Sequence, residues 1–257
     1  MTIQGVIARI TKGRRGWSIP LVVMASLAWG VAAPAWAQEF SEAELFFELN
    51  DTDEDPGIHA SIDGGPYTKL TIEDPRGRTI FTLGARGRLA KQGLTQLFLE
   101  SAEPTFEELD PEEFFDRFPE GEYEIEGVRN RREFEAEVEL SHVMAAPVEG
   151  ILVDGIPAAE DCDAVPLPSV SDPVIIDWEP VTESHPEIGE PGQVEIVRYQ
   201  FFVEQGDVKF AVDLPPTVTQ FQVPSEILAP GGEFKFEIIA RTADLNNTAV
   251  ENCFVVE

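Results

Sequence analysis

Apolar and polar residues alternate in short runs along most of the chain from Ala43 onward, and turn residues break these runs about every ten positions. The clearest run is FEAEVEL at residues 134–140, where apolar side chains alternate with three glutamates. Successive side chains of a β-strand point to opposite faces of a sheet, so this run predicts a strand with one buried face and one solvated face. The period of two predicts antiparallel sheets for most of the chain.

The predicted strands form two series, which are separated near Ala145. The first series lies near residues 43–50, 57–63, 68–73, 79–84, 94–100, 121–128 and 134–140. The second series lies near residues 149–154, 173–178, 194–204, 207–213, 217–223, 233–241 and 248–256. We therefore expect an all-β protein of two tandem β-sandwiches, at residues 38–145 and 146–257.

One stretch of the first series has a helical pattern. Asp110 supplies an N-cap, Pro111 occupies the first helical position and Glu113 the third. The phenylalanines that follow give the segment an apolar side before it ends at Pro119. The first sandwich is therefore expected to contain one short helix.

The first 37 residues have the three parts of a secretory signal peptide. They contain four basic residues and no acidic one, then an apolar run from Ile19 to Ala33, and they end in Ala35-Trp36-Ala37. A membrane anchor is the alternative, but the run is short for a membrane span, and no later run is long enough. We expect cleavage near Ala37 and a secreted or periplasmic mature protein. General secretion fits better than the twin-arginine route, because Gly16-Trp17-Ser18 after the arginine pair fits that signal poorly.

The mature part of the chain is strongly acidic. Without the leader it has 14 basic and 48 acidic residues, which gives a formal charge of −34. This charge repels nucleic acid and anionic membrane surfaces and favours cations or basic partners. Because 43% of the residues are hydrophobic and 17 are phenylalanine, the acidity does not indicate disorder.

Two charged stretches have more than one interpretation. Five of the 14 basic residues lie between Arg76 and Lys91, which indicates either a docking patch for an anionic group or charge balance within the molecule. Glutamates at 122, 124 and 126 and at 135, 137 and 139 would share one solvated face if their segments form a hairpin. Opposed like charges cost stability, and a basic partner, bound cations, or solvent and nearby arginines would offset that cost.

Several stretches of the second half follow one another in the order of a known domain. PVIIDWEPV at residues 173–181 places Trp178 in a second strand, VRYQF at 197–201 forms a third, and residues 212–247 run through a corner toward the last strand. In this order and spacing they resemble a fibronectin type III domain, a member of the immunoglobulin-like β-sandwich class. The resemblance covers nearly all of residues 148–257 and implies that Trp178 belongs to the core.

A short motif occurs once in each half, as PEGEY at residues 119–123 and as PGGEF at residues 230–234. In immunoglobulin-like sandwiches an aromatic residue near the start of the sixth strand forms the tyrosine corner, whose hydroxyl bonds to upstream backbone. The resemblance implies this corner for Tyr123 and, without the hydroxyl, for Phe234. The first half therefore resembles a divergent immunoglobulin-like sandwich, so that the fold is two such sandwiches in tandem.

The chain has two cysteines, Cys162 and Cys253. In an oxidising compartment such a pair is more often bridged than free, and the spacing matches no zinc pattern. The fibronectin resemblance implies that both cysteines lie at one pole of the second sandwich. It thereby supports a Cys162–Cys253 disulfide.

The most site-like stretch is NDTDEDPG, at residues 50–57. Asp51, Asp53 and Asp55 have the alternate spacing of carboxylates in calcium loops. An EF-hand is excluded, because Pro56 fills the glycine position and Ile62 stands where that loop has its glutamate. A calcium-binding turn of another kind and a solvated turn between two strands both remain open.

No motif in the sequence indicates catalysis. A nucleophile elbow, a phosphate loop and a reactive-cysteine pattern are absent, and the three histidines have no ligand spacing. We therefore expect an exported, non-catalytic binding or structural module that recognises a protein or a glycan, with no cofactor and no nucleic acid. The alternatives are a calcium-stabilised adhesion-type module and, less favoured, a hydrolase or its accessory domain.

Overall fold

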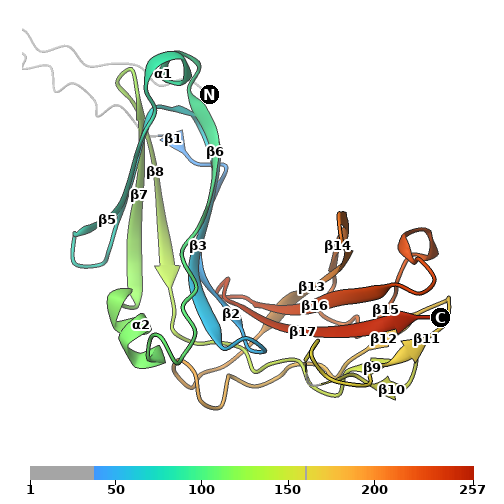
Figure 1. Ribbon diagram of the computed structural model, residues 1–257. Helices are drawn as coiled ribbons and strands as arrows, with labels where there is room; N and C mark the ends of the chain where they lie inside the picture. Colours follow the sequence, from blue (N-terminus) through green and yellow to red (C-terminus); the bar gives the residue numbers. More distant parts are fainter. Residues whose placement is uncertain (1–37, 160) are drawn as a thin grey trace, which may run out of the picture. The chain divides into compact units, whose positions relative to one another are not determined.

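The computed structural model describes residues 38–159 and 161–257 of the chain. The signal peptide predicted for residues 1–37 lies outside the described residues, and its cleavage near Ala37 stays a prediction. The described part is an all-β protein with two short α-helices (Figure 1). None of these helices is long and apolar enough to cross a membrane.

The first sandwich consists of two sheet layers around one hydrophobic core. Its strands are β1 (Gln38–Glu39), β2 (Glu42–Asn50), β3 (Asp55–Tyr67), β4 (Lys69–Glu73), β5 (Thr79–Gly84), β6 (Leu94–Glu100), β7 (Gly121–Arg129) and β8 (Arg132–Leu140). One layer has the order β1-β8-β7-β4-β5, and the other has the order β2-β3-β6. Alternate residues enter the core. In β7, for example, Tyr123 and Ile125 are fully buried between exposed glutamates.

The second sandwich encloses a core of its own. Its strands are β9 (Leu152–Val153), β10 (Ile156–Pro157), β11 (Ser169–Val170), β12 (Ile175–Asp177), β13 (Ile196–Gln205), β14 (Val208–Leu214), β15 (Gln220–Gln222), β16 (Glu233–Thr242) and β17 (Asn247–Val256). One layer has the order β10-β9-β12-β15, and the other has the order β14-β13-β16-β17. The short β11 pairs with β17, and the 3₁₀-helix η1 (Ser225–Ile227) precedes β16.

Both sandwiches have the same strand order. The layer β2-β3-β6 of the first corresponds to β9-β12-β15 of the second, and β5-β4-β7-β8 corresponds to β14-β13-β16-β17. This is the fibronectin type III-like arrangement that the resemblance implied for the second half. The first half, which resembles that domain only weakly in sequence, has the arrangement as fully as the second.

The two sandwiches share one eight-stranded sheet, in which β14-β13-β16-β17 continues into β2-β3-β6 and the short β11 beside β17 is the eighth strand. The connection is a parallel pairing of β17 with β2, where Asn247 lies opposite Glu48 and Ala249 lies opposite Asn50. Without this pairing β2 would be the edge of its layer, and β17 would have only the short β11 beside it on that side. The pairing covers part of both edges and gives the sheet an outward face that runs across both sandwiches.

The helices lie in the first sandwich. In α2 (Pro111–Arg117) the Asp110 side chain accepts the backbone N–H of Glu112, and Phe114 and Phe115 are buried against the core, as the sequence pattern predicts. The other helix, α1 (Gly87–Gln92), has no side-chain cap and no buried residue. The expectation of a single helix missed α1, because a six-residue exposed helix leaves no apolar period in the sequence.

Candidate functional site

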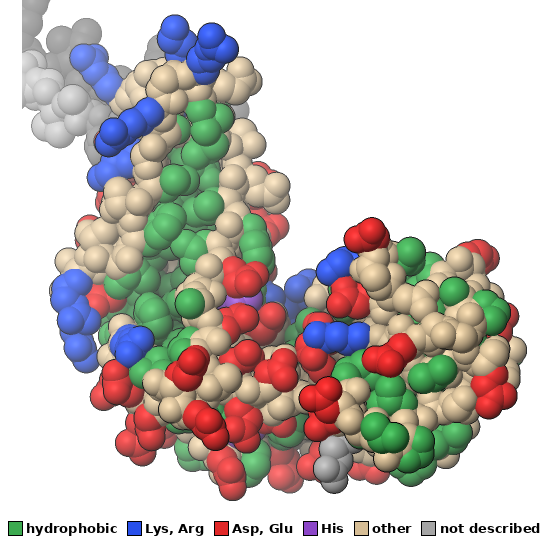
Figure 2. All heavy atoms as spheres, viewed as in Figure 1, with side chains coloured by type: hydrophobic (Ala, Val, Ile, Leu, Met, Phe, Trp, Pro, Cys, Tyr) green, Lys and Arg blue, Asp and Glu red, His purple; other side chains and the backbone are tan. Residues whose placement is uncertain are grey.

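A groove lies on the outward face of the eight-stranded sheet, where the two sandwiches join. It has a volume of about 670 Å³ and is lined by side chains of β2, β3 and β6 from the first sandwich and of β13, β14, β16 and β17 from the second. Its acidic members are Glu42, Glu44, Glu48, Glu100, Glu204 and Glu237. Figure 2 shows acidic side chains gathered over this part of the surface.

Aromatic rings form the apolar part of the groove. Phe46, on β2, lies with its ring centroid 5.5 Å from that of His59, on β3. The next centroid, that of Phe98 on β6, lies 6.0 Å from His59 with its ring edge-on. Phe46 and His59 are buried, but Phe98 is 61% exposed. No other aromatic side chain among the described residues is as exposed.

His59 also has a polar partner, since its Nε2 lies 2.9 Å from Oε1 of Glu103. The His59 side chain is only 4% exposed, so this contact satisfies a buried ring nitrogen. The contact holds the imidazole ring in place between the two phenylalanines. The row of rings is therefore fixed up to its last member, Phe98.

A buried arginine lies beside this row. The guanidinium of Arg241, on β16, is 4.7 Å from the centre of the Phe46 ring and donates to Oε2 of Glu44 at 2.8 Å. Arg241 is 5% exposed, and burial lowers the pKa of its guanidinium while the Glu44 carboxylate opposes that change. Since Glu44 belongs to the first sandwich and Arg241 to the second, this pair is part of the junction.

A second polar contact crosses the junction nearby. Asn247 Nδ2 donates to Oε2 of Glu48 at 2.7 Å, while Asn247 Oδ1 is buried and has no partner among the described residues. An unpaired buried carbonyl oxygen is rare in folded proteins and is expected to accept a donor from water or from a ligand. It adds an acceptor to the carboxylates of the groove.

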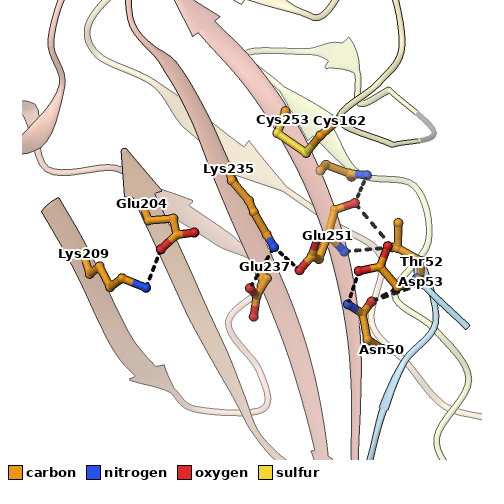
Figure 3. A network of polar contacts seen from close by, with 11 residues as sticks. Asn50, Thr52, Asp53, Cys162, Glu204, Lys209, Lys235, Glu237, Glu251 and Cys253 are labelled. Atoms are coloured by element: carbon orange, nitrogen blue, oxygen red, sulfur yellow. Dashed lines mark hydrogen bonds and ion pairs between the residues drawn. A yellow bond between two sulfur atoms is a disulfide. The ribbon is translucent and has the colours of Figure 1, made fainter. Parts of the chain in front are cut away.

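The far end of the groove carries a network of charges on β13, β14, β16 and β17 (Figure 3). Lys235 forms ion pairs with Glu251 and, at 3.8 Å, with Glu237, and Lys209 pairs with Glu204 at 2.7 Å. Burial, and then the charge of Glu251, raise the pKa of Glu237 to about 7. Ion pairing with Glu251 raises the pKa of Lys235, although burial opposes it.

Of the three aspartates predicted to bind calcium, Asp51 and Asp53 lie in the turn between β2 and β3, and Asp55 is the first residue of β3. Each has separate surroundings. Asp51 Oδ1 is 2.8 Å from Nε2 of His185, and Asp53 Oδ2 accepts from Asn50 Nδ2 at 3.0 Å. Burial, and then the charge of Glu103, raise the pKa of Asp55 to about 6. The described residues include no group of three or more His, Cys, Asp or Glu side chains placed to hold a metal ion. Calcium binding at this turn stays a prediction.

The structure gives this turn another role. Thr52 Oγ1 accepts the backbone N–H of Glu251 at 2.9 Å, and Asn50 Oδ1 accepts the N–H of Thr52 at 3.1 Å (Figure 3). The turn is thereby closed on itself by Asn50 and fastened to β17 by Thr52. Asp51 fastens it to His185 in the loop between β12 and β13, so the turn extends the contact between the two sandwiches.

The predicted disulfide is confirmed: Cys162 and Cys253 are bonded, and their Cα atoms lie 5.0 Å apart. Cys253 is on the outward side of β17, and Cys162 is in the segment between β10 and β11. The bond fastens this segment to the strand that also pairs with β2. It stabilises the second sandwich beside the groove and does not line the groove.

The two corner residues are fully buried or nearly so. The Tyr123 hydroxyl donates to the carbonyl of Pro119 at 3.0 Å, and burial raises the pKa of that hydroxyl. Phe234 makes no such bond and stacks on Phe254, with ring centroids 5.3 Å apart. Trp178 is 4% exposed and packs edge-on against Tyr199. These residues therefore contribute to the two cores rather than to a surface site.

The groove could not be found from the sequence, although its strands were predicted. Alternation places Glu44, Phe46 and Glu48 on one face of a strand, and a similar pattern places Lys235 and Glu237 on one face of another. Nothing in either pattern indicates that β2 and β17 are neighbours, because only three residue pairs about 200 positions apart connect them. The sequence does show that each of these strands has a charged outward face, but it does not show which strands lie side by side.

No protein-family model matches the sequence, and the comparison with curated proteins found no match. Among solved structures, the chain is similar to a segment of two fibronectin type III domains from chicken tenascin, with 13% identity and a TM-score of 0.30, over 84% of this chain and 98% of that one. It is also similar to the FN1–FN3 domains of chicken contactin, with 8% identity and a TM-score of 0.34, over 85% of this chain and 65% of that one. These values carry no conclusion about function. The strand order of the two sandwiches is what makes the fold fibronectin type III-like.

Proposed function

We propose that the chain is an exported, non-catalytic binding module whose groove binds a basic segment of a partner protein. One observation carries the proposal, namely that the exposed ring of Phe98 lies in the same groove as six carboxylates. Of these, Glu44, Glu204 and Glu237 also pair with basic residues of the groove. Lysine and arginine side chains bind carboxylates through charge-assisted hydrogen bonds and lie over aromatic rings. A segment that carries such residues would use both features together.

The charge of the whole chain supports a basic partner. A net charge of −34 outside the leader attracts cationic segments over long distances and repels nucleic acid. The rigid surroundings of the groove support binding as well, because its side chains project from strands rather than from loops. Export is supported by the signal-type leader and by the disulfide, which forms in compartments that oxidise thiols.

A titration followed by NMR tests this function. The probes are a short peptide rich in arginine and lysine, the same peptide with glutamate at the basic positions, and a neutral oligosaccharide. We expect the basic peptide alone to shift the amide signals of β2, β3, β6 and β16. Phe98→Ala and Glu100→Gln should each weaken its binding about fivefold, which corresponds to about 1 kcal/mol.

Val208→Ala is the matched control, because Val208 is an exposed apolar residue on β14 and is 48% exposed. It should leave the affinity unchanged. The proposal fails if the basic peptide gives no shift in the groove, or if Phe98→Ala binds it as well as the unaltered protein. Binding of the oligosaccharide in place of the peptide would make the module a glycan-binding one.

A further inference from the structure

From Thr79 to Glu100 the first sandwich has no buried residue. This segment comprises β5, α1 and β6, and its large hydrophobic residues are Ile80, Phe81, Leu83, Leu89, Leu94, Leu97, Phe98 and Leu99. Half of a strand's side chains normally enter the core, as Tyr123 and Ile125 of β7 do. In this segment the residues that face the core are only partly covered.

The incomplete burial occurs because both strands are edges. β5 ends the order of one layer and β6 ends the order of the other, so each has a neighbouring strand on one side only among the described residues. Phe81 and Leu83 of β5 and Leu97 and Leu99 of β6 pack against the core while remaining partly exposed. Figure 2 shows hydrophobic side chains reaching the surface along the first sandwich between these two strands. A long apolar edge of this kind is open to pairing with another strand.

Basic residues stand at both ends of β5. Arg76 and Arg78 precede the strand, and Arg86, Arg88 and Lys91 follow it in and beside α1. Figure 2 shows Lys and Arg side chains at the two ends of this part of the molecule. Five positive charges around one short strand are exceptional in a chain with a net charge of −30.

Most of these charges have no internal partner. Arg78 pairs with Asp74 at 2.6 Å, but the other four basic residues form no ion pair within the described part of the chain. The outward face of the second sandwich behaves differently, because Arg198, Lys209, Lys235 and Arg241 all pair with carboxylates there. Charge balance inside the molecule therefore does not account for the basic residues around β5.

We propose that β5, α1 and β6 form a second docking surface, on which a partner protein adds an extended strand to the free edge of β5. The added strand would have alternate apolar residues, which cover the half-exposed row of β5 and β6, and acidic residues at its two ends, which meet the basic residues. Strand addition uses backbone hydrogen bonds for affinity and alternate side chains for specificity. The inference does not depend on the groove, which uses the outward side of β6.

The charge of the chain favours a peptide strand over a lipid surface. A basic and apolar patch would also suit an anionic membrane, but the excess of carboxylates elsewhere repels such a surface. A single acidic strand is smaller than the patch and meets only its local positive charge. We therefore assign the surface to an extended acidic strand.

Hydrogen exchange and NMR titration with defined peptides test the assignment. The probe is a short peptide in which valine alternates with threonine and glutamates stand at both ends. The comparison peptides carry lysines at the ends, or carry the glutamates with alternate backbone amides methylated. We expect the first peptide alone to protect the amides of β5 from exchange. The double variant Arg86→Glu, Arg88→Glu should weaken its binding at least tenfold.

Val208→Glu is the control, since it adds a negative charge at an exposed position of the edge strand β14 of the other sandwich, outside the groove. It should bind the probe as the unaltered protein does. Equal binding of the methylated peptide would overturn strand addition, and equal binding of the lysine-ended peptide would overturn the role of the basic residues. No protection at millimolar peptide, or binding to vesicles of phosphatidylserine and phosphatidylcholine that Arg86→Glu abolishes, would overturn the assignment as well.

Discussion

At the scale of single residues, Asn246 holds the junction of the two sandwiches. It is fully buried, its Oδ1 accepts the N–H of Phe47 at 2.9 Å, and its Nδ2 donates to the carbonyls of Ser141 and Val143. Asn246→Ala leaves these three backbone groups without a partner, and each such group costs about 1–3 kcal/mol. We expect the free energy of unfolding in urea to fall by about 3 kcal/mol or more. Gln96→Ala, at an exposed position, should change it by less than about 0.5 kcal/mol.

A second prediction at the scale of single residues concerns calcium binding at Asp51 and Asp53. Asp51 and Asp53 hydrogen-bond to separate partners, and the described residues show no ligand cluster. We therefore expect millimolar calcium to shift the melting temperature no more than millimolar magnesium does. A larger shift with calcium, lost in Asp53→Asn, would contradict this expectation and support the calcium-binding turn that the aspartate spacing suggests.

At the scale of elements, the outward face of β16 makes stability depend on pH. The pKa of Glu237 is raised to about 7, so the folded state binds more protons than the unfolded state between about pH 4 and pH 7. Stability from this group is therefore lost as the pH rises through that window. Glu237→Gln should raise the melting temperature at pH 8 by about 2–4 °C and have little effect at pH 4. Glu133→Gln, at an exposed position, should leave the pH profile unchanged, and an equal effect of both variants would contradict the assignment.

The elements also show how far the sequence could lead. Alternation is a local property, so FEAEVEL predicted the strand β8, and the capping residues around Asp110 predicted α2. The pairing of β17 with β2 is a contact between distant segments, and no local pattern specifies it. The spacing of the aspartates after Asn50 suggested a metal. Their positions are instead set by hydrogen bonds of the turn. Asn50 bonds to Thr52 within it, Thr52 bonds to Glu251, and Asp51 bonds to His185.

At the scale of the whole molecule, repulsion between carboxylates opposes folding. In the sheet of β7 and β8 the pairs Glu122–Glu139, Glu124–Glu137 and Glu126–Glu135 lie directly opposite each other, as the hairpin interpretation predicts. Glu73 of β4 adds a further carboxylate beside Glu124. Directly opposed like charges in a sheet are destabilising, and a large net charge of one sign adds to that cost.

Salt should therefore stabilise this protein. Raising the ionic strength from about 0.01 M to about 0.15 M shortens the Debye length from about 30 Å to about 8 Å, which screens the repulsion between exposed carboxylates. We expect the melting temperature at pH 8 to rise by several degrees with sodium chloride. Glu124→Lys should raise the free energy of unfolding at low salt by up to about 1 kcal/mol. The same variant should show a smaller salt effect, because part of the repulsion has been removed. A melting temperature that is independent of salt would mean that the carboxylates of β7 and β8 are already neutralised, by bound cations or by a basic partner purified with the protein.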